Sequence, residues 1–318
     1  MLKVLFSRKC RCDVKQALII VLVCLSGGWV GVDVKPLSKE RSDLAPGQSG
    51  TYYQLSDAER KELVWMAKAA KAAYPDGDKP LGYRSFTRAE WEACSKGCPE
   101  LIYTEDGYFN VGSGLRGRLM VHMVNEGRVV LALSGVDDIT KSGIIEFAKD
   151  VVEAGKHYLD AERFRKLFSP EQYRQSLQLM NGVLAIKQRS HFWIVGHSLG
   201  GSLATYLALE IPSGRTRIKC ATFNGLGFSP FKSVSPEQQH HAAIRLRNVY
   251  CDGDPIYDLR KLPHLLGLEF QLPLPELLEP RHFGPSYSII GTGTALEQHS
   301  LDGLLRLMIK HRTKWQGL

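Results

Sequence analysis

The sequence predicts an α/β fold in which helices cover both faces of a mostly parallel central β-sheet. Short apolar runs rich in β-forming residues alternate along the chain with longer segments of helical periodicity. One such run, residues 191–195, passes through a glycine-bounded turn directly into the helical segment 202–210. The 318-residue chain is also 44% hydrophobic, which suits a globular protein with a full core.

Helix-start signals and strand-like runs organise the region that precedes this turn. The pattern Ser-x-x-Glu at 56–59 opens a helix that ends at 74–77, and Thr-x-x-Glu at 87–90 opens a shorter one. Strand-like runs follow at 118–124 and 128–133, joined by a polar turn.

The alternation continues to the C-terminus, apart from a Leu- and Pro-rich excursion at 260–285. In a parallel sheet of this kind, the ligand site lies beyond the carboxyl ends of the strands. The further predicted elements are an amphipathic segment at 141–156, a helix from Ser169 to about Gln188, strands at 218–223, 244–251 and 287–290, and a terminal helix that opens at His299-Ser300.

The N-terminus is typical of a targeting segment. Five basic residues within the first 15 precede an apolar run at 17–32 that is shorter than the ~20 residues needed to span a bilayer. We therefore expect residues 1–32 to be a signal peptide or an N-terminal membrane anchor, so that the protein is exported or anchored. The polar stretch 33–50 is expected to be a linker, followed by the main domain at 51–318.

The charge balance gives no sign of nucleic-acid binding. The formal charge is +8, but the N-terminal 30 residues hold five basic and one acidic residue, so that 8 − 4 leaves +4 for the remainder. A surplus of this size fits weak attraction to anionic surfaces such as phospholipid headgroups.

Four cysteines follow the targeting segment. Cys94 and Cys98 could close a small disulfide loop in an oxidising compartment, while Cys220 and Cys251 lie in apolar strand patterns and are expected to be buried. No second Cys/His pair at ligand spacing stands beside the first two, so the sequence implies no zinc site.

The glycine-bounded turn carries the strongest chemical signal in the chain. Residues 196–201 read Gly-His-Ser-Leu-Gly-Gly, and a Gly-x-Ser-x-Gly pattern between a strand and a helix is a nucleophile elbow. Its geometry exposes the hydroxyl of Ser198 above the sheet edge. The backbone N–H of Leu199, at the start of the helix, can then face a developing oxyanion.

A nucleophilic serine needs a base, which in this architecture follows it in the chain. The order in the chain is serine, then Asp or Glu, then histidine, and four of the ten histidines lie beyond the acid candidates at 252 and 254: His264, His282, His299 and His311. We favour His299, because it stands on a loop after a strand and at a helix start. His264 and His282 remain alternatives, whereas His311 lies within a helical segment and is expected at the surface.

The carboxylate that orients this base is expected between the serine and the histidine. Asp254 follows a β-rich strand and precedes a proline, which makes a rigid loop at the carboxyl end of that strand. Asp252 is two residues away and has the same chemistry, although an Asp-Gly pair is also a common turn. Asp254 is the preferred candidate, with Asp252 the alternative.

A second oxyanion donor should come from the loop after an earlier strand. The segment Ser134-Gly135-Val136 follows the run 128–133 and could supply a backbone N–H near Val136. An ordinary strand-ending turn explains the same residues equally well.

These residues together resemble the class 3 lipase family, a branch of the α/β-hydrolases, over about residues 55–310. The most specific part is the hexapeptide 196–201 with the small-residue helix after it. Supporting parts are Ala-Lys-Ala-Ala-Tyr at 70–74, Asp254-Pro255 after a strand, and His299 before the last helix.

The chain departs from the family at one place. The family's oxyanion loop reads Arg-Gly-Thr or Arg-Gly-Ser, whereas the matching segment here is Ser134-Gly135-Val136, which keeps the backbone donor and loses the hydroxyl. The resemblance also implies a lid over residues 137–150, with Ile144, Ile145 and Phe147 as its apolar face. An ordinary amphipathic surface helix is the alternative for that segment.

The resemblance implies a serine ester hydrolase of lipids, close to a triacylglycerol lipase, that works at a lipid interface with Ser198, Asp254 and His299 as its triad. It implies no metal or cofactor. A phospholipase A1 or a lipid acyltransferase would use the same triad. An inactive hydrolase fold that binds lipid or protein is the alternative of another class, and the altered oxyanion segment is its support.

Overall fold

A computed structural model gives the fold of most of the main domain. The described residues belong to one compact unit, Tyr52–Leu318. In that part of the chain no helix is both long and apolar enough to cross a membrane. The structure describes residues 55–97, 100, 102–104, 106–110, 114–135, 170–187, 191–212, 217–228, 233–254, 256–257, 281–310 and 316–317.

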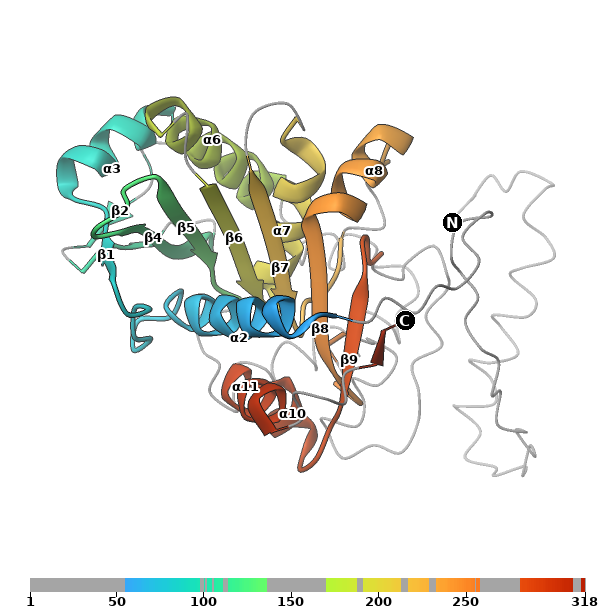
Figure 1. Ribbon diagram of the computed structural model, residues 1–318. Helices are drawn as coiled ribbons and strands as arrows, with labels where there is room; N and C mark the ends of the chain where they lie inside the picture. The colour runs from blue at the N-terminus through green and yellow to red at the C-terminus, as the bar shows by residue number, and fades with distance from the viewer. Residues whose placement is uncertain are drawn as a thin grey trace, which may run out of the picture. The chain divides into compact units, whose positions relative to one another are not determined.

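One mixed β-sheet forms the centre of this unit (Figure 1). Among the described residues its strand order is β10-β9-β8-β7-β6-β5-β4-β3-β2, with β1 paired to β4. The strands from β5 to β9 are parallel, and antiparallel strands extend both edges. The strands are β1 (Tyr83–Ser85), β2 (Ile102–Tyr103), β3 (Tyr108–Asn110), β4 (Arg116–His122), β5 (Arg128–Leu133), β6 (His191–His197), β7 (Ile218–Phe223), β8 (Leu246–Asp252), β9 (Ser286–Ile290) and β10 (Gln316–Gly317).

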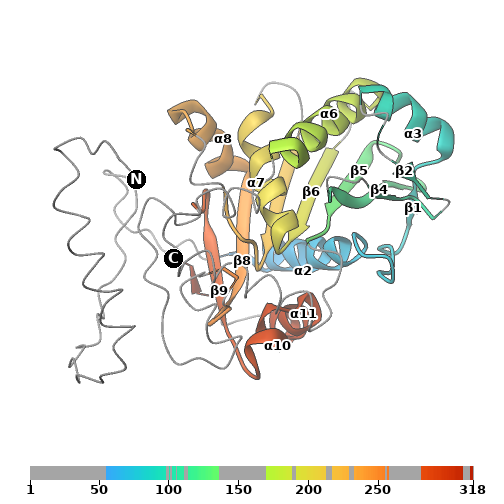
Figure 2. The same cartoon turned by 180° about the vertical axis from the view of Figure 1, so that it is seen from behind.

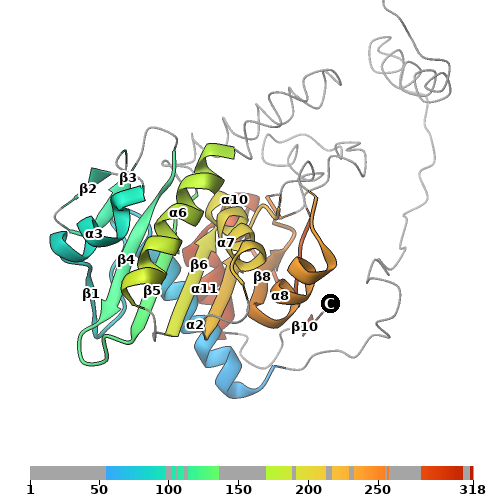
Figure 3. The same cartoon turned by 90° about the horizontal axis from the view of Figure 1, so that it is seen from above.

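Helices cover both faces of the sheet, as the sequence predicts. Figure 1 has α2 in front of the strands, and Figure 2, from the opposite side, has α6 and α7 in front. Figure 3 shows α6 and α7 again from above. The helices are α2 (Asp57–Lys71), α3 (Arg88–Cys94) with a 3-10 turn at Ser95–Gly97, α6 (Pro170–Ile186), α7 (Leu199–Glu210), α8 (Pro236–Arg245), α10 (Ala295–His299) and α11 (Leu301–Lys310).

Each face of the sheet has its own apolar core. In β5, Leu131 packs with residues of α3, α6 and α7, while the next residue, Ala132, packs with residues of α2 and α11. This alternation follows from the period of two in a strand, and it explains why the run 128–133 is apolar throughout. The predicted α/β-hydrolase fold class is confirmed.

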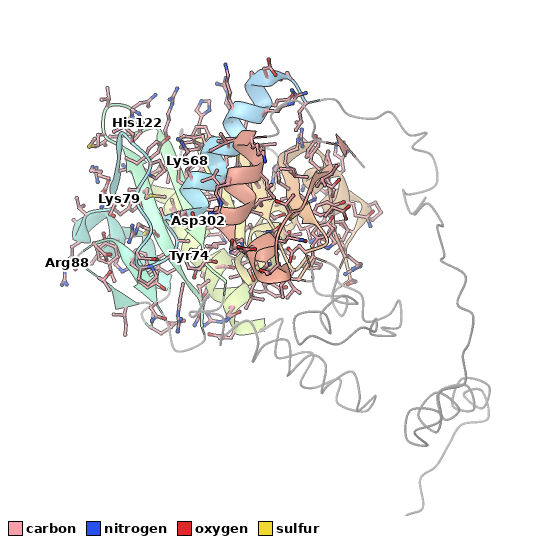
Figure 4. All side chains as sticks on the ribbon, turned by 90° about the horizontal axis from the view of Figure 1, so that it is seen from below. Lys68, Tyr74, Lys79, Arg88, His122 and Asp302 are labelled. Atoms are coloured by element: carbon pink, nitrogen blue, oxygen red, sulfur yellow. The ribbon has the colours of Figure 1, made fainter. Side chains whose placement is uncertain are left out.

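Helix α11 lies beside α2 on the second face (Figure 4). The Nζ atom of Lys71 at the end of α2 contacts the Asp302 carboxylate at the start of α11 at 2.8 Å. Both ends of the ion pair are solvent-exposed, so the packing of the two helices depends mainly on their apolar stripes.

Local signals placed most helix starts correctly. Ser56 and Thr87 accept hydrogen bonds from the backbone N–H groups of Glu59 and Glu90, and both glutamates complete their capping boxes. A third capping box, formed by Ser235 with Gln238, begins α8.

The sequence prediction was wrong at the boundary between α8 and β8. Ile244 was expected to begin a strand, but α8 continues to Arg245 and β8 begins at Leu246, because the capping box at Ser235 starts a full helix there. The predicted opening of the terminal helix at His299-Ser300 is confirmed, since α11 begins at Leu301 and Oγ of Ser300 accepts from the backbone nitrogen of Gly303 at 3.0 Å. The short helix α10, which was not predicted, ends at His299 directly before it.

Several predictions fall outside the described residues. These are the signal or anchor at 1–32, the linker at 33–50, the amphipathic segment at 141–156 and the excursion up to residue 280. The disulfide between Cys94 and Cys98 is also untested, since Cys98 is not described. Two other predictions are confirmed, because Cys220 and Cys251 are buried.

Candidate active site

The turn between β6 and α7 holds Ser198 in an uncommon backbone conformation. Its φ is 57° and its ψ is −126°, a region that residues other than glycine rarely occupy. Strain of this kind costs on the order of 1–3 kcal/mol and is found mainly at functional sites. The strand, the strained serine and the helix together form the geometry of a nucleophile elbow.

Neighbouring glycines make room for this turn. A Cβ on Gly196 would overlap the carbonyl of Gly200, and a Cβ on Gly200 would overlap the carbonyl of Leu133 at the end of β5. A Cβ on Gly135 would lie 2.9 Å from the Cβ of Ser198. The backbone after β5 therefore lies directly against the serine.

Ser198, His299 and Asp254 form one chain of hydrogen bonds. The Oγ atom of Ser198 lies 3.1 Å from Nε2 of His299. On the other side of the ring, Nδ1 lies 3.0 and 3.2 Å from the two carboxylate oxygens of Asp254. Because a carboxylate accepts, Nδ1 carries the proton, and Nε2 is left to accept the proton of the serine hydroxyl.

The loop after β8 holds Asp254 in place. Its carboxylate is buried and accepts a second hydrogen bond, 3.0 Å from the backbone nitrogen of Ile256. Asp252, the alternative acid, is solvent-exposed at the end of β8. The structure thus brings Asp254, and not Asp252, into contact with the histidine.

Of the other three candidate histidines, the structure describes His282 alone. His282 stacks on the ring of Tyr257, with centroids 4.0 Å apart. His264 and His311 lie outside the described residues.

Of the two predicted oxyanion donors, the structure describes Leu199. Leu199 is the first residue of α7, and Ser198, as the N-cap residue, makes no side-chain capping hydrogen bond. The N-terminus of α7 therefore directs backbone N–H groups toward the space above the serine. Val136 and the predicted lid at 137–150 lie outside the described residues, so neither prediction is tested.

Asn224, at the end of β7, is a supporting residue that the sequence did not reveal. Its φ is 46°, and its Nδ2 donates to the backbone carbonyls of Gln298 at 2.7 Å and His299 at 2.9 Å. Its Oδ1 accepts from the backbone nitrogen of Cys251 at 2.8 Å. One amide thus joins the loop after β7 to the segment that carries the histidine.

A second unforeseen contact involves His197, the residue before the serine. Its Nε2 lies 2.8 Å from the carbonyl oxygen of His299, and its Nδ1 lies 2.7 Å from the hydroxyl of Tyr74. Since the carbonyl only accepts, Nε2 carries the proton and Nδ1 accepts the hydroxyl proton of Tyr74. The ring of His197 is therefore neutral and fully hydrogen-bonded.

Burial and the neighbouring His299 lower the pKa of His197 to about 3. In the unfolded chain the pKa of a histidine is near 6.5. Between pH ~3 and pH ~6.5 the unfolded state therefore binds a proton on His197 that the native state does not bind. Its contribution to stability is complete above pH ~6.5 and is lost as the pH falls toward 3.

We expect acid to weaken the fold through this residue. Between pH 7 and pH 5 the free energy of unfolding should fall by about 2 kcal/mol on account of His197, because 1.4 kcal/mol accompanies each pH unit. Urea denaturation at several pH values measures this slope. A His197→Gln variant should lose the contribution, and equal slopes for both proteins would contradict the assignment.

The described residues contain no cluster of three or more His, Cys, Asp or Glu side chains that could hold a metal ion. The groups that the described site offers for chemistry are the hydroxyl of Ser198, the imidazole of His299 and the carboxylate of Asp254.

Comparison with known families agrees with this geometry. A family model described as "Lipase (class 3)" matches residues 139–249, which include the elbow, β7 and most of β8. In this segment the chain is similar to class 3 lipases. The resemblance seen in the hexapeptide 196–201 is thereby confirmed, and the class 3 lipase relationship identifies a carboxylic ester hydrolase.

Solved structures similar to this chain include lipases from fungi. The Lip2 lipase of Yarrowia lipolytica is 14% identical, with 79% of this chain and 86% of that one covered and a TM-score of 0.42. A triacylglycerol lipase of Penicillium expansum is 13% identical, with 76% and 84% covered and a TM-score of 0.41. A search of curated protein sequences found no match.

Proposed function

We propose that this class 3 lipase-like chain hydrolyses carboxylic esters of lipids through an acyl-enzyme formed on Ser198. The observation that carries the proposal is the continuous hydrogen-bond chain from the Ser198 hydroxyl through His299 to the buried Asp254. It stands on a strained turn of the kind that presents a nucleophile.

In the first half of the reaction, Oγ of Ser198 attacks the carbonyl carbon of the ester, and its proton moves to Nε2 of His299. The new positive charge on the imidazole is balanced by Asp254, which holds Nδ1–H. When the tetrahedral intermediate collapses, Nε2 gives this proton to the leaving alcohol oxygen. The acyl group remains on the serine.

In the second half, water gives a proton to Nε2 of His299 and attacks the acyl carbon. Collapse of this intermediate releases the carboxylic acid and returns the proton to Ser198. In both halves the carbonyl oxygen becomes an oxyanion. We assign its donors to the backbone N–H groups of Leu199 and Val136, each worth on the order of a hundredfold in rate.

The lipid substrate class is supported by the family match over 139–249. The basic and apolar N-terminal segment fits the same proposal, since an exported or anchored chain would meet lipid at an interface. The segment 137–150 is our proposal for a lid that opens there.

The full chain should be treated with a fluorophosphonate probe, and the labelled residue located by mass spectrometry. Hydrolysis should then be measured on a soluble short-chain ester, a triacylglycerol emulsion and phospholipid vesicles, with heat-unfolded protein as the control. We expect labelling at Ser198 and turnover that is fastest on the emulsion.

The other results would each point elsewhere. Labelling with faster turnover of phospholipid would replace the triacylglycerol assignment by a phospholipase. A folded chain that neither labels nor hydrolyses any of the three esters would overturn the catalytic proposal in favour of a binding module.

A further inference from the structure

A buried chain of hydrogen bonds runs behind the candidate triad, from the loop after β5 to the backbone of the base. The backbone nitrogen of Gly135 donates to the hydroxyl oxygen of Tyr74 at 3.2 Å, and that hydroxyl donates to Nδ1 of His197 at 2.7 Å. The opposite ring nitrogen of His197 donates to the carbonyl of His299 at 2.8 Å.

Each donor and acceptor in this chain has a single consistent role. Tyr74 accepts from Gly135 and donates to His197, and His197 accepts on Nδ1 and donates from Nε2. The carbonyl of His299 receives a second donor from Nδ2 of Asn224 at 2.9 Å. No rearrangement of protons is needed, so the chain has one stable orientation.

The environment makes this chain stiff. The side chain of His197 is fully buried, and Tyr74 is 6% exposed. Hydrogen bonds are stronger away from water, and a buried group that loses its partner carries a large desolvation cost. Burial also raises the pKa of Tyr74 above its usual value, so its hydroxyl keeps the proton that it donates.

Both ends of the chain lie close to the reacting serine. Gly135 is so close to Ser198 that an added Cβ would lie 2.9 Å from the Cβ of the serine. His299 holds the general base, 3.1 Å from the serine Oγ. A shift at either end would alter the distance between the base and the serine or the position of the proposed oxyanion loop.

We propose that Tyr74 and His197 are positioning residues that couple the loop after β5 to the backbone of His299, and so hold both at the distances that ester hydrolysis by Ser198 requires. The proposal rests on the function proposed above. Neither side chain touches the reacting atoms, so each acts through the backbone that it holds.

This role explains two sequence features that the triad leaves unused. Tyr74 ends the Ala-rich segment 70–74, just beyond α2, where Figure 4 marks it. His197 occupies the variable position of the elbow pattern between Gly196 and Ser198. The segment that follows α2 is thereby connected to His197 and Gly135, beside Ser198, through the hydroxyl of Tyr74.

The test measures kcat and KM separately on a soluble short-chain ester, with active sites counted by fluorophosphonate labelling of the full chain. Tyr74→Phe removes only the hydroxyl. We expect kcat to fall about 10- to 100-fold with KM within about twofold, since misplacement by an ångström can cost about a hundredfold. The rate of labelling should fall by the same factor.

Three further variants separate positioning from simple loss of stability. Tyr103→Phe removes a hydroxyl that donates to the carbonyl of Phe86, away from the site, and should lower the melting temperature with kcat unchanged. His197→Gln keeps an N–H donor for the carbonyl of His299, whereas His197→Leu does not. We expect at least about fivefold higher kcat for the glutamine variant.

The outcomes are distinguishable. If wild-type protein does not label, the proposed function itself fails, whatever the variants do. If wild type labels and Tyr74→Phe keeps the wild-type kcat while its melting temperature falls like that of Tyr103→Phe, the positioning role is overturned. Equal kcat for His197→Gln and His197→Leu would overturn the contact with His299 as its route.

Discussion

Replacing Ser198 by alanine should remove all hydrolysis and all fluorophosphonate labelling. The loss expected in kcat is about a millionfold, the size found when a catalytic serine is deleted from a comparable triad. The reason is direct: without Oγ, the base His299, 3.1 Å away in the wild type, has no hydroxyl to deprotonate. Turnover of a short-chain ester at high enzyme concentration measures it.

The serine variants also test the strained turn. Glycine occupies a φ of 57° more easily than alanine, so Ser198→Gly should be as inactive as Ser198→Ala and at least as stable. Urea denaturation compares the two. The exposed Ser233→Ala serves as the matched control and should keep full activity. Residual activity in Ser198→Ala above one part in about ten thousand would argue for another nucleophile.

Replacing Asp254 by asparagine should lower kcat about 10⁴-fold while the protein stays folded. The carboxylate accepts from Nδ1 of His299, which leaves Nε2 free to accept the serine proton. An amide nitrogen at the same place would donate to Nδ1 and favour the opposite tautomer, in which Nε2 already carries a proton. Steady-state kinetics on a soluble ester measures the effect.

Asp252 offers a matched control two residues away. It has the same chemistry, but it is exposed at the end of β8, so Asp252→Asn should change kcat less than about twofold. The pair of variants decides between the two acids that the sequence left open. A large loss in Asp252→Asn with little effect of Asp254→Asn would reverse the assignment.

Short sequence patterns were enough to predict the main helices and strands of the fold. Capping boxes at Ser56 and Thr87, an apolar run at 128–133 and the strand before the elbow all appear in the structure within a few residues of their predicted bounds. These features depend on contacts between residues three or four apart, or on the alternation of one strand, so the sequence displays them directly.

The predicted secondary structure was wrong where a local helix signal was overlooked, or where pairing with a residue distant in the chain defines the element. The boundary between α8 and β8 moved because Ser235 with Gln238 begins a helix that includes Ile244. The short strands β1 to β3 were not predicted at all. Each is two or three residues long and is defined by pairing with a neighbour, as β3 is with β4.

Some residues of the candidate site could be predicted from the sequence, and others could not. Chain order and the elbow pattern sufficed to select Ser198, Asp254 and His299 as candidates, because that order follows from the topology of the sheet. Tyr74 and Asn224 could not be selected from the sequence. Tyr74 is 123 residues from His197, and nothing in either segment indicates that a hydroxyl and a ring nitrogen will lie 2.7 Å apart.

The sequence by itself determined the α/β class, the elbow at 196–201 and the similarity of that segment to class 3 lipases, since each is encoded in residues close together in the chain. Only the tertiary structure decided that Asp254 rather than Asp252 contacts His299. It also decided that His197 contacts the backbone carbonyl of His299 and that Tyr74 contacts His197. Hydrogen bonds across the sheet depend on distances of tenths of an ångström between separate elements, and these arise only when the whole domain packs.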